Sequence, residues 1–394
     1  MTAGIYIHLP FCKKKCIYCD FVSFCGVSES TVNDYLSALG EELNMSWYRN
    51  FNYSSAGTSA SRGVQKNNWN PELVRANLNE LTIYIGGGTP SVLTPRQFET
   101  LFSIVRKFEG KITEFTVECN PESIDGQKLS KMFEAGVNRL SFGVQSFNDN
   151  FLAWLGRLHT AGDAEKKYNL ARSCGFKNIN IDLIYGISGQ DLVSWEKTLK
   201  ETIALSPEHV SIYPLTIEEG TPYFDLLSES IKSRPDPDLQ ADMYFCACEF
   251  LESRGYKRYE ISNFARPGRE CRHNLNYWLN GEYLGLGVSA VSYVNGVRSK
   301  NVSSLTEYFA RLEKNRSTAA ESEKLEGRMR SAERLILGLR TSRGVRLLPG
   351  EECFGEKLSN EKLYGLIEKS PDGVWRLTKS GFYLSNAVFR ELLV

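Results

Sequence analysis

Three cysteines near the N-terminus are the residues whose type and spacing point most directly to chemistry. Cys12, Cys16 and Cys19 follow one another with three and then two residues between them, in a loop that also carries three consecutive lysines. Thiolates this close together repel one another unless a metal centre holds them. Three thiolates suit a four-iron, four-sulfur cluster with one iron left open, and such a cluster acting on adenosylmethionine is a route to carbon radicals.

Other uses of the cysteines stay open at this stage. A structural zinc site needs four protein ligands, and His8 is the residue that would have to complete it. Against this, the apolar Ile7 and Leu9 alternate with His8, so His8 is expected to line a cavity instead. Most of the remaining cysteines are interpreted as buried small apolar residues: Cys25, Cys119, Cys174, Cys246, Cys248 and Cys353.

The chain around the cysteine loop alternates between strand and helix patterns, which is typical of parallel βαβ units. The predicted strands are 4–10, 81–86, 113–118, 139–145, 178–184 and 209–215. The predicted helices between and after them are 30–47, 95–108, 126–135, 162–174, 191–205 and 238–253. The pattern predicts a partial (β/α)6 barrel of the α/β class.

Polar side chains gather where these strands end, at 86–89, Glu118, Gln145, Asp182 and 213–214. The carboxyl ends of parallel strands lie at one face of a barrel or open sheet, which is where such folds bind ligands. These groups are therefore expected to converge on one mouth, next to the cysteine loop.

The length and composition of the chain indicate how many domains it has and what class of protein it is. The 394 residues predict two to three domains: a barrel over 1–220 with an insertion without apolar periodicity at 49–70, an α+β extension over 221–325, and a small helical or winged-helix-like module over 326–394. Lys plus Arg equals Asp plus Glu at 47 each, so the overall charge does not favour nucleic acid. The chain has no apolar run of about 18 residues, and we expect a cytoplasmic protein without a transmembrane segment.

Several ordered motifs together resemble a known family. The cysteine spacing, with Tyr18 before the third cysteine, resembles the signature of the radical adenosylmethionine (SAM) superfamily. Residues 5–12 (IYIHLPFC) look like the opening of the oxygen-independent coproporphyrinogen III oxidase family, which acts in porphyrin biosynthesis. Residues 86–91, 140–147 and 180–186 are similar to its further motifs.

Two departures separate the branches of this family. The oxidases usually have Cys-Gly-Cys at the end of the cysteine loop, whereas here Cys19 is followed by Asp20-Phe21. Residues 273–278 (HNLNYW) match a motif of the HemW-type branch, whose members are regarded as haem chaperones. The resemblance thus implies a carrier that delivers haem to apo-haemoproteins, respiratory ones among them, and that lacks the oxidase activity. The alternatives are an oxidative decarboxylase of coproporphyrinogen III, or a zinc-stabilised barrel with another role.

The resemblance also implies roles for individual residues. Cys12, Cys16 and Cys19 would bind the cluster, and SAM would chelate its open iron. The residues matched to SAM binding are Tyr6, Tyr18, Gly87, Gly88, Thr89, Glu118, Gln145, Arg157 and Asp182. A carboxylate can accept from the amino group of SAM, and a guanidinium can pair with its carboxylate. Without the resemblance, the glycines would be a tight turn, Glu118 a surface ion pair and Tyr18 loop packing.

His273 is the residue matched to haem binding. Haem iron is commonly held by His or Cys, so Cys271 is a second candidate, and Tyr277 and Trp278 would flank a flat porphyrin. A structural role for His273 is the alternative. The family further implies a homodimer and transient contact with a membrane during delivery.

Overall fold

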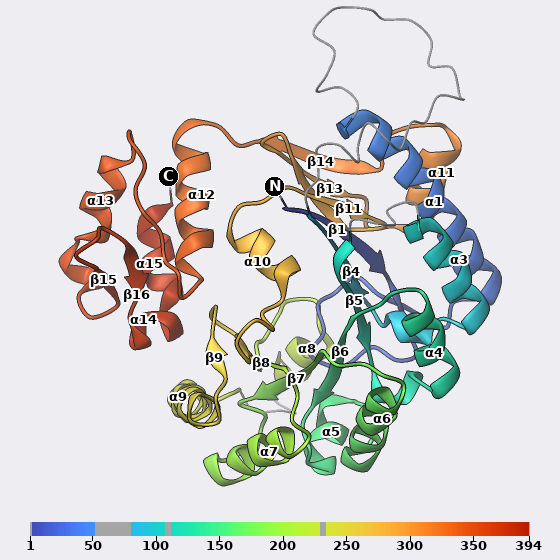
Figure 1. Cartoon of the computed structure of the whole chain (residues 1–394), viewed down its shortest axis with the longest axis horizontal. Coiled ribbons are helices and arrows are strands. Elements are labelled where there is room, and N and C mark those ends of the chain that lie inside the picture. Colours follow the sequence, from blue (N-terminus) through green and yellow to red (C-terminus); the bar gives the residue numbers. More distant parts are fainter. Residues whose placement is uncertain (1, 52–79, 107–111, 229–233, 394) are drawn as a thin grey trace, which may run out of the picture.

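The computed structural model describes residues 2–51, 80–106, 112–228 and 234–393 (Figure 1). Of the insertion predicted at 49–70, residues 49–51 end the first long helix and the others lie outside the described residues. No helix in the described ranges is long and apolar enough to cross a membrane.

Six parallel strands are hydrogen-bonded in sequence order and form a partial (β/α)6 barrel. They are β1 (Thr2–Leu9), β4 (Glu80–Gly87), β5 (Ile112–Cys119), β6 (Arg139–Gln145), β7 (Ile179–Tyr185) and β8 (His209–Pro214). On β1, Ile5, Ile7 and Leu9 are at most 2 % exposed in the core, whereas Tyr6 and His8 point to the other side of the strand.

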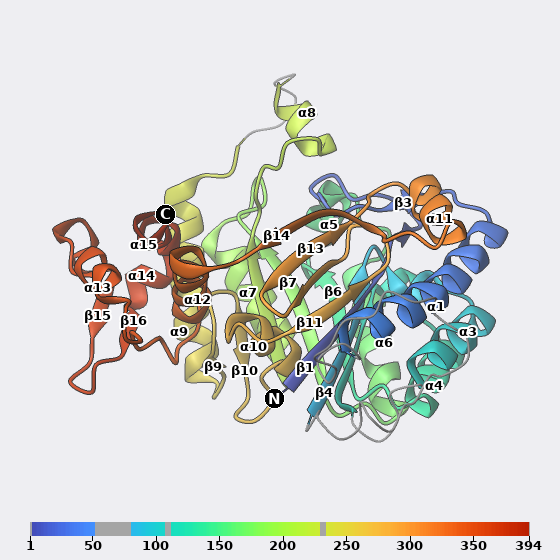
Figure 2. The same cartoon turned by 90° about the horizontal axis from the view of Figure 1, so that it is seen from above.

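Helices connect these strands and cover the outer face of the sheet (Figure 2). They are α1 (Glu29–Phe51), α3 (Pro95–Val105), α4 (Gly126–Glu134), α5 (Asp149–Leu155), α6 (Ala161–Ser173) and α7 (Leu192–Ala204). Side chains at Thr94, Thr160 and Asp191 cap α3, α6 and α7 by accepting a hydrogen bond from the backbone three residues on. The predicted helices agree with these bounds to within a few residues, whereas α5 was not predicted.

Strands from the second half of the chain extend both edges of the parallel sheet. β11 (Tyr283–Leu286) pairs with β1, followed by β12 (Val291–Val294), β13 (Val297–Asn301) and β14 (Ala319–Lys324). β10 (Asn263–Ala265) pairs with β8 and then with β9 (Lys257–Arg258). Within the described ranges β1 and β8 do not pair, so the barrel stays open while neither of these strands is an exposed edge.

A buried carboxylate fixes the N-terminal helix to this extension. Glu42 on α1 is 2 % exposed. It accepts hydrogen bonds from the Gly287 backbone (2.7 Å), Asn301 Nδ2 (2.6 Å), the Tyr308 hydroxyl (2.7 Å) and the Thr318 hydroxyl (2.7 Å). Because a buried carboxylate is stable only when its hydrogen-bonding capacity is met, these four donors tie the extension firmly to α1.

The remaining helices surround the sheet. They are α8 (Pro222–Ser228), α9 (Pro237–Ser253), α10 (Arg272–Trp278) and α11 (Leu305–Glu313). The C-terminal part contains α12 (Gly327–Leu339), α13 (Glu352–Leu358), α14 (Lys379–Tyr383), α15 (Ser385–Leu392) and the hairpin of β15 (Ile367–Lys369) with β16 (Trp375–Leu377). The turn of this hairpin lies at 371–373. The domain boundaries at 220 and 325 stay predictions.

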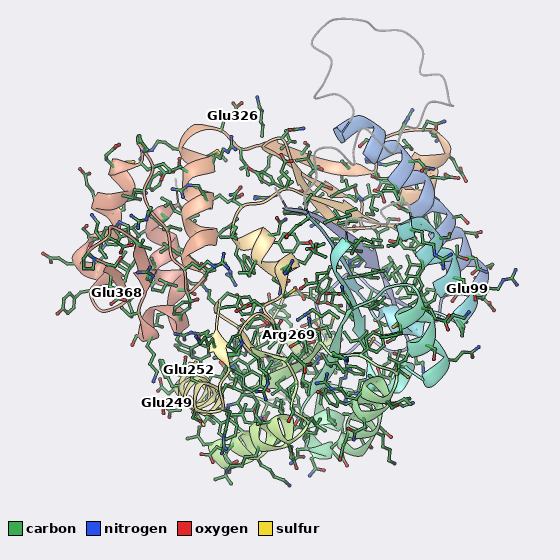
Figure 3. The ribbon with its side chains drawn as sticks, viewed as in Figure 1. Glu99, Glu249, Glu252, Arg269, Glu326 and Glu368 are labelled. Carbon is green, nitrogen blue, oxygen red and sulfur yellow. The ribbon has the colours of Figure 1, made fainter. Side chains whose placement is uncertain are left out.

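Several contacts join the C-terminal part to the extension, among them two at Arg340 and Thr341. The Arg340 guanidinium lies 4.3 Å from the centre of the Trp278 ring, and Glu260 pairs with Thr341 in an isolated β-bridge. Figure 3 shows charged side chains such as Glu99, Glu326 and Glu368 at the periphery of the molecule, where water solvates them.

Candidate functional site

The cysteine loop leaves β1 at Leu9 and places three half-buried thiols around one cavity. Cys12 lies on the short strand β2 (Phe11–Cys12), which pairs with β3 (Phe24–Cys25). Cys16 and Cys19 share a turn in which the Cys19 N–H donates to the Cys16 carbonyl (3.3 Å). All three line a cavity of about 440 Å³.

The glycine-rich turn after β4 is packed directly against the start of this loop. The Gly88 N–H donates to the Leu9 carbonyl and the Thr89 N–H to the Phe11 carbonyl, both at 2.8 Å. A Cβ at position 88 would lie 2.8 Å from the Phe11 nitrogen, so only glycine allows this approach. The Thr89 hydroxyl lies 3.4 Å from Cys12 Sγ, which connects the turn to the first thiol.

Glu118 lies at the end of β5, beside the same turn. Its carboxylate accepts from the Gly87 N–H (3.1 Å) and from the Tyr84 hydroxyl (2.9 Å). A Cβ at position 86 would lie 2.8 Å from this carboxylate, which accounts for the neighbouring glycine. Burial and the nearby Asp182 carboxylate raise the pKa of Glu118 to about 7. Glu118 is therefore not the surface ion pair considered as an alternative.

Arg157 connects the cysteine loop to two strand ends. Its guanidinium donates to Cys16 Sγ (3.5 Å), to Asn120 Oδ1 (2.7 Å) and to the Gly143 carbonyl (2.8 Å). Its Nε is buried and has no hydrogen-bond partner in the described part of the chain. A buried cation with a free donor beside the thiols suits an anionic group in this cavity.

Asp182 and Gln145 border the same cavity from β7 and β6. The Asp182 carboxylate accepts from the Ser141 hydroxyl (3.0 Å) and from Asn180 Nδ2 (2.8 Å), while burial raises its pKa. Gln145 has a φ of 69°, in the left-handed region that non-glycine residues rarely adopt. Such strain is more common at ligand sites than elsewhere.

The prediction that the strand ends converge beside the cysteine loop is confirmed. Of the predicted site residues, those that line the 440 Å³ cavity are Cys12, Cys16, Cys19, Tyr18, Gly87, Gly88, Thr89, Glu118, Gln145, Arg157 and Asp182. Which ligand they hold stays a prediction.

A second, larger cavity of about 1010 Å³ adjoins the first. Residues that line both are Asp20, Phe21, Tyr84, Glu118 and Tyr213. The structure places the two other predicted site residues, Tyr6 and His273, in the wall of this second cavity, together with Tyr277 and Trp278.

His273 is 1 % exposed, and both of its ring nitrogens are hydrogen-bonded. Nδ1 lies 2.8 Å from the Thr82 hydroxyl and Nε2 lies 2.7 Å from the Tyr277 hydroxyl. Burial, with a contribution from the Arg139 guanidinium, lowers the pKa of His273 to about 3, so the imidazole is neutral. Glu114 orients the start of α10 by accepting the His273 N–H (3.0 Å).

Two expectations about cysteines are wrong. Cys271 does not line either cavity: it is fully buried, and its thiol donates to the Glu114 carboxylate (3.3 Å), because α10 begins over that carboxylate. Of the six cysteines expected to be buried, only Cys119 and Cys248 are. Cys25, at the end of the short strand β3, is exposed, and Cys174, Cys246 and Cys353, at or on helices α6, α9 and α13, are half-buried.

His8 lines the larger cavity, as its alternation with apolar residues predicted. Its Nδ1 lies 3.0 Å from the Tyr6 hydroxyl, and its Nε2 lies 3.0 Å from the Val22 carbonyl. These contacts do not favour His8 as a fourth zinc ligand. In the described ranges, no three His, Cys, Asp or Glu side chains are placed to hold a single metal ion.

The donor set fits a group larger than one ion. Burial raises the pKa of the Cys19 thiol to about 11 and also raises that of Cys12, so these thiols need a strongly cationic group to become ligands. Three thiols around one cavity, with Arg157 against Cys16, provide three of the four sites of an iron–sulfur cluster and leave one open.

Two residues of the site were missed from the sequence. Tyr84 bonds Glu118 and lines both cavities, and it alternates with the buried Ile83 and Ile85, the same pattern that placed His8 in a cavity wall. Asn120 bridges Thr89 Oγ1 (3.0 Å) and Arg157, and its position just after a strand end was the available signal.

Comparisons with known proteins agree with this geometry. Residues 6–202 match the model of the radical SAM superfamily. The chain is 34 % identical to the "Heme chaperone HemW" of Bacillus subtilis (strain 168), covering 98 % of both chains. It is 35 % identical to the protein of the same name in Escherichia coli (strain K12), over 73 % of this chain and 69 % of that one. The coproporphyrinogen III oxidase HemN of Escherichia coli shares the fold, with a TM-score of 0.80 over 99 % of this chain and 89 % of that one at 23 % identity.

Proposed function

The chain belongs to the radical SAM superfamily and, within it, to the HemW family, and from this membership we propose that it is a haem chaperone. In this proposal it binds haem in the larger cavity, carries a four-iron, four-sulfur cluster with SAM in the smaller one, and transfers haem to apo-haemoproteins. The observation that carries the proposal is the shared wall: the cavity next to the cysteine loop adjoins one large enough for a porphyrin, which His273 lines.

The residues of the smaller cavity would bind the cluster and different parts of SAM. Cys12, Cys16 and Cys19 would hold the cluster, whose open iron SAM would chelate and which would supply the electron that reduces SAM. Glu118 would accept from the amino group of SAM, and the free Nε of Arg157 suits its carboxylate. Asp182 and Gln145 would bond the adenosyl portion, and Tyr18 would limit water at the cysteine loop.

His273 would act in the larger cavity as a neutral imidazole, the form that binds haem iron. To bind the iron, one ring nitrogen of His273 must give up its hydrogen bond to the Tyr277 or the Thr82 hydroxyl. Tyr277 and Trp278 border the same space and would contact the porphyrin.

The test is anaerobic reconstitution of the cluster followed by haem titration, measured by absorbance. Stoichiometric haem binding that falls at least tenfold in His273→Gln supports the proposal. The matched control is His209→Gln, since His209 is also buried with both ring nitrogens hydrogen-bonded, but it lines neither cavity.

A parallel assay distinguishes the oxidase, whose fold this chain shares. The same reconstituted protein receives coproporphyrinogen III, SAM and a reductant. The expected result is that the protein binds haem and does not convert coproporphyrinogen III. Conversion without specific haem binding would overturn the proposal in favour of the decarboxylase.

A further inference from the structure

The wall of the larger cavity contains buried polar atoms that have no hydrogen-bond partner within the described ranges. They are Trp278 Nε1, Asn280 Nδ2, the Ser289 hydroxyl and the Tyr293 hydroxyl. Tyr293 itself is 4 % exposed. A buried polar group without a partner destabilises the protein, so these atoms are available to a polar ligand, and two of them, the Ser289 and Tyr293 hydroxyls, lie at the β12–β13 hairpin.

The hairpin of β12 and β13 supplies one face of this wall. Val291 lies opposite Lys300, and Tyr293 lies opposite Arg298. Because side chains alternate along a strand, these four share one face, and all of them line the cavity. Ser289 precedes β12 and also lines the cavity.

The two cations on this face differ in their availability. Arg298 is paired with Glu323 (3.1 Å) and with Glu333 on α12, so its charge is compensated. Lys300 is exposed and forms no ion pair with any described residue. Lys300 is therefore the cation that remains free to meet an anionic group.

Much of the remaining wall is apolar or aromatic, although Glu333 on α12, which pairs with Arg298, also lines it. Met329, Ile336 and Leu337 on α12 face the cavity, as does the Trp278 ring on α10. Figures 1 and 2 show α10 lying between α12 and the strands β11–β14. At the end shared with the smaller cavity, Asp20 and Glu118 would repel an anion whenever they are ionised.

We propose that the β12–β13 face is a carboxylate subsite that orients a planar, dicarboxylic tetrapyrrole. The Tyr293 and Ser289 hydroxyls and the Lys300 ammonium bond the propionates, while the ring packs between α12 and the Trp278 side chain. The propionates point away from the cysteine loop, and the cargo enters in one orientation. This inference rests on the proposed haem-binding function and adds to it the recognition of the two carboxylates.

The test compares haem with haem dimethyl ester, which keeps the iron and the ring but removes both negative charges. Using the full chain with a reconstituted cluster, we expect haem to bind at least tenfold more tightly than the ester, as charge-assisted hydrogen bonds predict. Lys300→Gln should weaken haem binding three- to tenfold and leave the affinity for the ester unchanged, whereas Tyr293→Phe should weaken the binding of both, because an ester carbonyl still accepts from a hydroxyl.

Lys324→Gln is the matched control: Lys324 is an exposed lysine on the adjacent strand β14, outside the cavity, and its replacement should change neither affinity. Thermal unfolding and the cluster absorbance of each variant show that the fold is intact. If wild-type protein binds haem and the ester equally, or if Lys300→Gln weakens both alike, the subsite is overturned and the haem-binding function stands. If neither compound binds saturably, the proposed function itself fails.

Discussion

Glu118 is a carboxyl group whose pKa lies close to neutral pH in this site. The Gly87 N–H and the Tyr84 hydroxyl both favour the ionised form, yet burial and Asp182 outweigh them and raise the pKa to about 7. A ligand amino group bonded to this carboxylate would draw it back to the ionised state. Glu118 thus couples ligand binding to proton release.

This coupling predicts a pH-dependent affinity for SAM. About a tenth of Glu118 is ionised at pH 6 and about nine-tenths at pH 8, so SAM should bind roughly tenfold more weakly at pH 6. Isothermal titration of reconstituted protein across this range measures the effect. Glu118→Gln should bind weakly at every pH, whereas the exposed Glu99→Gln should retain the full dependence; a steep profile in Glu118→Gln would contradict the assignment.

The same shift affects the stability of the ligand-free protein. The folded-state pKa of Glu118 lies above its ordinary value of 4.5, so the folded state favours the neutral acid. The stabilisation is complete below about pH 4.5 and is lost as the pH rises through about 7. Urea unfolding at pH 5 and pH 8 should show a smaller difference in Glu118→Gln than in wild type.

His273, the proposed ligand of the haem iron, is held in place by hydrogen bonds before haem binds. Its low pKa keeps the imidazole neutral at physiological pH, but Tyr277 occupies Nε2. Removing the phenol should therefore free that nitrogen: Tyr277→Phe is expected to raise haem affinity about fivefold, since a typical hydrogen bond contributes about 1 kcal/mol. Haem titration checks this against Tyr364→Phe, an exposed residue in the C-terminal part. Weaker binding in Tyr277→Phe would mean that the hydroxyl itself bonds haem, in addition to the contact made by the ring.

At the scale of elements, the turn after β4 sets the position of the cysteine loop. The Gly88 and Thr89 N–H groups bond to the loop backbone at Leu9 and Phe11, and the Thr89 hydroxyl approaches Cys12. The loop therefore takes its position from β4 as well as from the strand that precedes it.

Gly88→Ala should disturb this contact and with it the cluster. The added methyl group would lie 2.8 Å from the Phe11 nitrogen, and overpacking of this kind destabilises proteins by about 1–3 kcal/mol. We expect less than half of the wild-type iron per chain after reconstitution. Gly126→Ala is the control, because its nearest new neighbour is a Leu170 methyl group at 3.9 Å. Normal iron content in Gly88→Ala would show that the loop does not depend on the turn.

At the scale of the whole molecule, two cavities share one wall formed by Tyr84, Glu118 and Tyr213, among others. A ligand that shifts these side chains in one cavity changes the shape and charge of the other. The sheet that carries the wall is continuous across the barrel and the extension, so the two sites belong to one packed unit.

The shared wall predicts energetic coupling between SAM and haem. Each ligand should change the dissociation constant of the other by the same factor, since coupling free energies are reciprocal, and factors of about 5–150 are typical. Titrating each ligand with and without the other measures both factors. Tyr213→Ala should reduce the coupling, whereas Tyr364→Ala should not. Independent binding of the two ligands would contradict the idea that the shared wall transmits the effect.

Much of the barrel was predictable because its signals are local. The strands from β1 to β8 alternate or run apolar over seven or so residues, and the predicted bounds agree with the structure to within two residues. The helix α5 was not predicted, since seven residues are too few to establish a helical period. The short strands β9 to β13 were not predicted one by one, because two to five residues give no readable period.

The sequence by itself determined the spacing of the three cysteines, the succession of strands along the chain and the polar groups at the strand ends. Each of these features depends only on residues that are neighbours along the chain. Only the tertiary structure decided that Cys271 faces Glu114 and not a cavity, and that both nitrogens of His273 are occupied. It alone placed Tyr293 and Lys300 in the wall of a cavity that α12 also lines. These contacts join residues far apart in the chain, and local periodicity carries no information about which distant surfaces meet when the sheet extends and the helices pack over it.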